Sequence, residues 1–84
     1  VCTDHSETPI QYLTLTVGIC IKHGLDLQSA VDSITINAAE IAGIDDLCGS
    51  VEVGKRADLV MFSGNPFEVM TSPEAVFVGG IRQL

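Results

Sequence analysis

The sequence predicts a single small α+β unit in which helices come first and strands second. Apolar residues recur at helical spacing between residues 9 and 43, and each run opens with a helix-capping pattern. After Gly49, short apolar runs alternate with glycine-containing turns, which is typical of strands. A chain of 84 residues leaves room for one domain only, since domains usually hold roughly 100 to 200 residues. We therefore expect a helical layer joined to a small sheet.

The first helix is expected to begin at Pro9. Thr8 is suited to cap it, proline is favoured at the first helical position, and Gln11 stands three residues after the cap. Apolar residues then cover nearly the whole circumference as far as residue 21, so this helix should be buried on more than one side. Gly24 supplies its C-terminal stop.

Two shorter helices are expected to follow. Asp26 can cap the second helix, which should fray at the β-branched run of residues 34–36. Asn37 can cap the third helix, because Glu40 stands at the third helical position and completes a capping pattern. This third helix should end at Gly43.

The second half of the sequence predicts strands separated by tight turns. The expected strands cover residues 50–53, 57–62, 76–78 and 81–84. The first two are joined by a turn at residues 54–56, and Gly79 and Gly80 form a two-residue hairpin turn between the last two. A sheet of this size is barely large enough to be stable alone.

Charge and composition exclude several classes of partner. Eleven acidic against four basic side chains give a formal net charge of -7, which opposes binding to nucleic acids and to anionic membranes. The longest apolar stretch, residues 10–21, is too short to cross a membrane. The three cysteines are odd in number and far apart, which favours free thiols in the reducing cytoplasm over a disulfide framework.

The chain is more apolar than its size predicts. Small domains have the largest surface for their volume, yet 46% of these residues are hydrophobic and only 18% are charged, against about 25% in ordinary domains. Some apolar surface should therefore need a covering that the chain itself cannot supply. The chain also opens at Val1 rather than at a methionine, and we expect a piece of a larger protein. The competing hypothesis is a small self-associating module without catalysis, whose helix faces pair with a second copy.

Asp4 and His5 are the candidate site residues. They lie between the strand-like residues 1–3 and the first expected helix, and in α/β barrels such a strand-to-helix junction faces the active site. A carboxylate there can ligate a metal or accept a proton from metal-bound water. An aspartate before a helix can equally be a turn or capping residue, so the spacing leaves both roles open. A zinc site formed with Cys2 is disfavoured, because a closed site needs four ligands.

Several segments together resemble the C-terminal end of the amidohydrolase superfamily of metal-dependent hydrolases. Residues 49–60 follow its pattern of glycine, serine, a hydrophobic residue, two variable residues, glycine, lysine, a variable residue, alanine, aspartate, leucine and valine. Residues 35–43 resemble its threonine-x-asparagine-proline-alanine helix, with Ala38 in place of the usual proline, and residues 76–81 resemble its closing hairpin. Thr3-Asp4-His5, followed by residues 9–13, is most similar to the imidazolonepropionase-like branch.

This resemblance implies a fold and a reaction. The family builds an eight-stranded (β/α) barrel with one or two divalent metals, often zinc, at the carboxyl ends of its strands. A small β-sandwich is assembled from both chain termini. Residues 1–48 would then be the end of the last barrel strand and the last helices, and residues 49–84 would be strands of the sandwich. The reaction class is hydrolysis of carbon-nitrogen bonds in non-peptide, amide-like or cyclic amide small molecules.

Asp4 corresponds in this resemblance to the aspartate that ends the eighth barrel strand, ligates the metal and carries a proton from the attacking water to the leaving group. His5 beside it is expected to contact the substrate. The family's other metal-binding histidines and its lysine or glutamate have no counterpart in this sequence. We therefore expect the chain alone to bind no metal and to be inactive, with the remainder of the barrel and the N-terminal sandwich strands as its partners. Homo-oligomerisation stays open.

Overall fold

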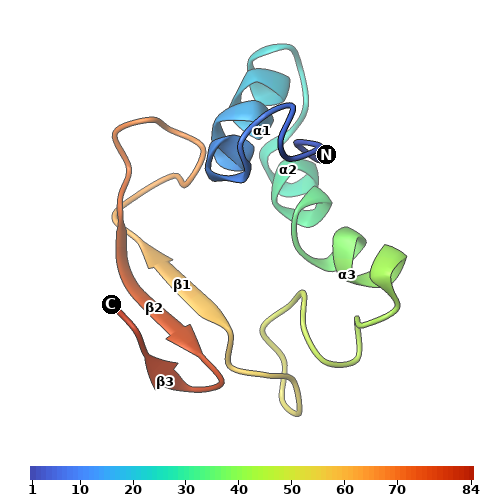
Figure 1. Cartoon of the computed structure of the whole chain (residues 1–84), viewed down its shortest axis with the longest axis vertical. Coiled ribbons are helices and arrows are strands. Elements are labelled where there is room, and N and C mark those ends of the chain that lie inside the picture. The colour runs from blue at the N-terminus through green and yellow to red at the C-terminus, as the bar shows by residue number, and fades with distance from the viewer.

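A computed structural model describes all 84 residues and shows helices and a sheet as two separate layers (Figure 1). The elements follow in the order of a 3-10 turn (Ile10–Tyr12), α1 (Leu13–Lys22), α2 (Leu27–Ser33), α3 (Ile36–Ala42), β1 (Leu59–Phe62), β2 (Pro73–Val78) and β3 (Ile81–Arg82). Helices precede strands, which confirms the α+β prediction. No helix is long and apolar enough to span a membrane.

The first helix starts later than predicted and with a different cap. Pro9 has an extended backbone with φ -55° and ψ 138°, so the chain turns through the 3-10 segment before α1 begins. Thr8 does not cap this start; instead the Nδ1 atom of His5 accepts a hydrogen bond of 2.8 Å from the Ile10 amide. The predicted stop is confirmed, because Gly24 adopts a positive φ of 113° and the Leu25 amide bonds back to the Cys20 carbonyl.

Of the caps predicted for the next two helices, the first is confirmed and the second is wrong. Asp26 caps α2 as expected, its carboxylate accepting a 3.0 Å hydrogen bond from the Ser29 amide. The expected cap of α3 at Asn37 is wrong, because α3 begins at Ile36 and Asn37 lies inside it. Thr35 occupies the capping position, but its hydroxyl donates to the Val31 carbonyl at the end of α2, at 2.7 Å. The α2–α3 junction therefore uses this side chain to close the preceding helix.

The Asp26 cap predicts a specific dependence of α2 on pH. Hydrogen bonds from the Ser29 amide, and then from its hydroxyl, hold the pKa of Asp26 below its ordinary value of 3.8. A lowered folded-state pKa means that the charge stabilises the fold above pH 3.8 and loses this effect as the pH falls through the folded pKa. We expect Asp26→Asn to keep the cap oxygen and to abolish this acid-dependent loss of helix, measured by circular dichroism against pH. Identical acid transitions in the two proteins would contradict the assignment.

The sheet is antiparallel, with β2 between β1 and β3. Val60 of β1 stands opposite Val76, and Val78 of β2 stands opposite Ile81. The strand order leaves one edge of β1 unpaired. The strand expected over residues 50–53 is wrong for this structure, since this segment has no hydrogen-bonded neighbour strand. A strand-like pattern cannot form a strand without a partner.

The turn between β2 and β3 is the predicted two-glycine turn. Gly79 and Gly80 have φ values of 58° and 81°, a conformation that side chains with a Cβ rarely adopt. The Gly79 amide donates to the Asp58 carboxylate at 2.7 Å, and the Gly80 amide donates to the Ala57 carbonyl at 3.0 Å. Arg56 forms an ion pair with Asp58 at 3.2 Å. The segment before β1 therefore holds the hairpin turn, which lies at the same end of the sheet.

The core of the chain lies between α1 and α2 and is closed by a residue from the sheet layer. Val17 of α1 and Ala30 of α2 are fully buried, and Phe67 from the β1–β2 connection packs against both. A Cβ on Gly18 would lie only 2.8 Å from the Phe67 carbonyl oxygen, so glycine is required for this close approach.

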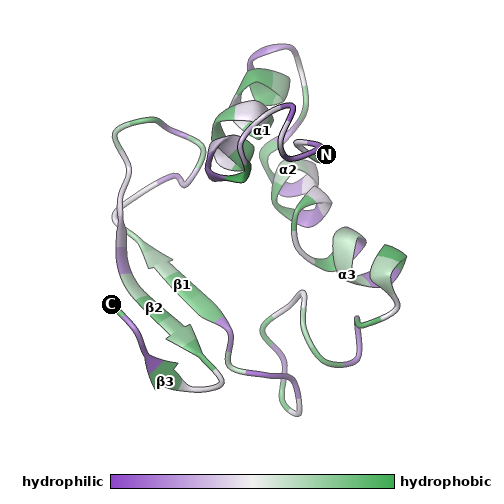
Figure 2. Ribbon diagram, viewed as in Figure 1, coloured by the Kyte–Doolittle hydropathy of each residue, from purple (hydrophilic) through white to green (hydrophobic).

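Most of the apolar surface lies outside this core. Only six of 84 residues are buried, and the accessible surface is 6037 Å². A compact protein of 8.9 kDa is expected to expose about 4800 Å². The radius of gyration of 13.2 Å likewise exceeds the value of about 11.9 Å expected for a compact chain of this length. Apolar segments remain visible along both layers, β1 included (Figure 2). The expected excess of exposed apolar surface is therefore observed.

Candidate functional site

Asp4 lies at the tip of a tight turn that leads into the 3-10 segment. It is exposed and is the only residue other than glycine with a positive φ, at 51°. Aspartate tolerates this left-handed conformation better than most residues do. The turn is closed by the Glu7 amide, which donates to the Asp4 carbonyl at 2.8 Å, and by the Thr8 amide, which donates to the buried Thr3 at 3.3 Å. Neither of the two ion pairs of the chain involves Asp4, so its carboxylate is open to a ligand.

The structure gives His5 a role that the sequence pattern did not indicate. Its Nδ1 accepts from the Ile10 amide across the whole turn, at 2.8 Å. A ring nitrogen that accepts a hydrogen bond carries no proton, so the neutral ring holds its proton on Nε2. Only Nε2–H therefore stays available as a hydrogen-bond donor. Asp4 and His5 are adjacent in one turn, as predicted, but His5 is already engaged through one of its two nitrogens.

The residues of this chain do not by themselves assemble a metal site. No three histidine, cysteine, aspartate or glutamate side chains lie together in a way that could hold a metal ion. A catalytic zinc site usually has three protein ligands and a structural site has four. Asp4 can supply one ligand, and the others would have to come from residues outside this chain.

A concave feature lies apart from the Asp4 turn, between the helices and the sheet. It is an open apolar groove of about 660 Å³, and its walls come from α2, α3, the segment that follows α3, and β1. The residues lining it are Val31, Ile34, Thr35, Ala38, Ala39, Ile44, Cys48, Gly49, Ser50, Val51, Arg56, Asp58, Leu59, Val60 and Phe62. Arg56 and Asp58 are its only charged residues, and they already pair with one another. The groove therefore offers apolar contact and no evident catalytic group.

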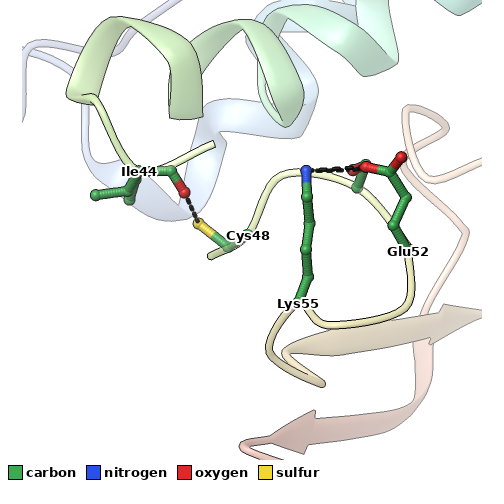
Figure 3. Close-up of polar contacts among 5 residues, drawn as sticks. Ile44, Cys48, Glu52 and Lys55 are labelled. Atoms are coloured by element: carbon green, nitrogen blue, oxygen red, sulfur yellow. Dashed lines mark hydrogen bonds and ion pairs between the residues drawn. The ribbon is translucent and has the colours of Figure 1, made fainter. Parts of the chain in front are cut away.

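A polar cluster shapes the segment that borders this groove. The Lys55 ammonium lies 3.0 Å from the Glu52 carboxylate and donates to the Ser50 hydroxyl at 2.7 Å (Figure 3). The Ser50 hydroxyl in turn donates to Glu52. The hydrogen bond from Ser50, and then Lys55, holds the pKa of Glu52 below its usual range. Because Lys55 is engaged by both Glu52 and Ser50, we interpret the cluster as a structural contact that shapes this segment.

Two residues that position the fold were missed by sequence reasoning. Phe67 closes the helix core from a connection whose only sequence signal is the turn at Asn65-Pro66 before it, which predicts a loop and not a buried anchor. Asp58 holds the β2–β3 turn across 21 residues of sequence. No local pattern carries either contact, because both join segments that are distant along the chain.

The comparisons with known proteins agree with the resemblance. The family model described as "Amidohydrolase family" matches residues 2–82. An imidazolonepropionase from a Geobacillus species is 44% identical over 67% of this chain, and an adenine deaminase from Ligilactobacillus salivarius is 39% identical over 61%. The crystal structure of an amidohydrolase from Thermotoga maritima matches 96% of the chain with a TM-score of 0.91 and 33% identity.

These similar proteins are much longer than this chain. The chain spans 13% of the imidazolonepropionase, 9% of the adenine deaminase and 21% of the Thermotoga maritima amidohydrolase. The two-layer arrangement, with its exposed apolar faces, is thus the arrangement of a segment of a known larger fold. Because the family match extends over nearly every residue, the chain belongs to the amidohydrolase family.

Proposed function

We propose that this chain is the C-terminal part of a metal-dependent amidohydrolase that hydrolyses carbon-nitrogen bonds in small amide-like or cyclic amide substrates. The observation that carries the proposal is the family match over residues 2–82, in which Asp4 stands on an exposed turn directly before the first helix with its carboxylate open to a ligand. The similar proteins include an imidazolonepropionase and an adenine deaminase, so their names do not point to one substrate.

Within this proposal, residues 1–48 belong to the end of the barrel and residues 49–84 to the small sandwich. Two features support the division. The helices and the strands form separate layers (Figure 1), and the sheet is antiparallel, as in a sandwich and unlike the parallel sheet of a barrel. Residues 49–58 connect the layers, and Phe67 is the contact that returns from the sheet layer to the helices.

Asp4 and His5 carry the chemistry of the proposal. The Asp4 carboxylate takes a proton from the attacking water and passes it to the leaving nitrogen, which is general base and then general acid catalysis. The Nε2–H of His5 is a hydrogen-bond donor suited to the carbonyl oxygen of an amide substrate. The same resemblance makes Asp4 one ligand of a divalent metal, such as zinc, which would act as a Lewis acid and lower the pKa of a bound water. The other ligands are not in this chain.

The partners that we propose are the remainder of the barrel and the N-terminal strands of the sandwich. The accessible surface exceeds the compact value by about 1200 Å². Exposed apolar residues lie on both layers, among them Ile41 of α3 at 90% and Ile81 of β3 at 69% exposure. The open groove and the unpaired edge of β1 would be covered by the same partners. We place the protein in the cytoplasm, a reducing compartment that suits its three unpaired cysteines.

The alternative is a self-associating module without catalysis, and the same exposed faces favour it. An activity and sedimentation experiment separates the two. We expect the purified chain to show no hydrolysis of cyclic amide or aminopurine substrates with added zinc, and a longer protein that includes it to be active. Turnover by the chain alone, with stoichiometric zinc, would contradict the proposal. A stable symmetric dimer that melts cooperatively, together with an inactive longer protein, would favour the module.

A further inference from the structure

The turn that carries Asp4 runs from a left-handed residue to an extended proline. Asp4 has a left-handed backbone with φ 51°, which is unfavourable for a residue with a side chain, and Pro9 is extended with φ -55° and ψ 138°. Proline has no amide hydrogen, so Ile10 carries the first backbone donor after this bend. The Ile10 amide is taken by the Nδ1 atom of His5, at 2.8 Å. This single bond therefore joins the turn to the helix entrance on the far side of Pro9.

The other bonds of the turn are made by the backbone alone. The Glu7 amide donates to the Asp4 carbonyl at 2.8 Å, and the Thr8 amide donates to the Thr3 carbonyl at the longer distance of 3.3 Å. Both end before Pro9, so neither limits rotation of the turn relative to the helix. His5 contributes the only side-chain hydrogen bond within residues 3–10.

We propose that His5 is a positioning residue whose Nδ1 atom, by accepting from Ile10, holds Asp4 in its left-handed turn and so fixes where the Asp4 carboxylate lies. The same bond selects the ring tautomer, leaving the proton on Nε2. One residue then acts through two separate nitrogens: Nδ1 orients the general base, and Nε2 contacts the substrate. The expected effect on kcat rests on the proposed function, whereas the expected effect on the Asp4 turn does not.

Two matched substitutions separate the two nitrogens. The Oδ1 atom of His5→Asn falls close to the place of Nδ1, and the terminal group of His5→Gln falls close to the place of Nε2. We expect His5→Asn to keep the Asp4 turn and His5→Gln and His5→Ala to lose it. The coupling between the amide and α protons of Asp4 reports its φ, and a coupling across the hydrogen bond between His5 Nδ1 and the Ile10 amide reports the bond itself. Both are measured by NMR on the isotope-labelled chain.

The kinetic experiment uses the active longer protein. A displaced catalytic group can cost on the order of 10²-fold in rate. We therefore expect His5→Gln to lower kcat by roughly 10- to 100-fold with little change in KM. His5→Asn should keep kcat within about threefold and raise KM, because the Nε2 donor is lost. The reverse order, with glutamine preserving kcat and asparagine losing it, would overturn the positioning role.

The two levels of failure can be told apart. Absence of the coupling between His5 and Ile10, or an unchanged Asp4 φ in His5→Gln and His5→Ala, overturns the inference whatever the activity. The inference is supported if the coupling between His5 and Ile10 is observed, and if the Asp4 turn is kept in His5→Asn and lost in His5→Gln and His5→Ala. If those hold and the longer protein hydrolyses no amide, the proposed function fails while the positioning of Asp4 by His5 stands.

Discussion

Asp4→Asn is expected to lower kcat of the active longer protein by about 10²- to 10⁴-fold, the usual contribution of a general acid-base group. The side-chain amide of asparagine cannot accept a proton from water, and it is also a poorer ligand for a divalent metal than a carboxylate is. Asparagine has nearly the same shape and, like aspartate, tolerates a left-handed backbone. The turn closed by Glu7 and Thr8 should therefore persist, and thermal unfolding should change little.

Glu7→Gln is the matched control for this substitution. Glu7 is an exposed carboxylate in the same turn, and only its backbone amide takes part in closing that turn. The change removes one negative charge three residues from Asp4. We expect kcat to stay within about twofold, because an exposed charge that takes no part in the reaction contributes little free energy. Normal activity of Asp4→Asn, or equal losses in both variants, would refute the catalytic assignment of Asp4.

Phe67→Ala should produce the largest loss of stability of any single side-chain truncation in this chain. Phe67 is 7% exposed and is the only member of the core cluster that comes from the sheet layer. Removing a buried phenylalanine side chain typically costs about 3 to 5 kcal/mol in the free energy of unfolding. We expect the β1–β2 connection to detach from α1 and α2, which urea unfolding and hydrogen exchange at the amides of α1 would detect.

Met70→Ala provides the control from the same connection, because Met70 is 91% exposed and its truncation should leave the free energy of unfolding nearly unchanged. Gly18→Ala tests the same contact from the helix side. Its added Cβ would meet the Phe67 carbonyl oxygen at 2.8 Å, so it should weaken the fold by displacing the connection. Equal stability of Phe67→Ala and Met70→Ala would show that Phe67 does not anchor the two layers.

The elements that could be predicted are those with local signals. Asp26 caps α2, Gly24 and Gly43 end α1 and α3 with positive φ, and Gly79 and Gly80 form the hairpin turn. Each of these depends on bonds between residues a few positions apart, which the sequence displays directly. The amidohydrolase resemblance was also visible in the sequence, because it rests on contiguous motifs, and the family match confirms it.

The incorrect predictions concern residues that lack the partner their pattern requires, or whose expected partner bonds to a different residue. Residues 50–53 have a strand pattern, yet Val51 and Val53 stand exposed because no neighbouring strand pairs with them. At the candidate site, the capping pattern at Thr8 was present in the sequence, but Pro9 is extended and His5 takes the Ile10 amide instead. A capping pattern identifies side chains that can accept a hydrogen bond from the start of a helix. Which of them accepts it depends on the backbone conformation of the folded chain.

The sequence by itself determined the kind of elements, their order, most of their ends and the family, since these follow from local spacing, backbone preference and contiguous motifs. Only the tertiary structure decided that Phe67 closes the helix core, that Asp58 holds a turn 21 residues away and that His5 spans the Asp4 turn. These three contacts depend on how the chain folds back in space. They stabilise the fold through burial and through hydrogen bonds, and no repeating pattern in the sequence indicates which residues are partners.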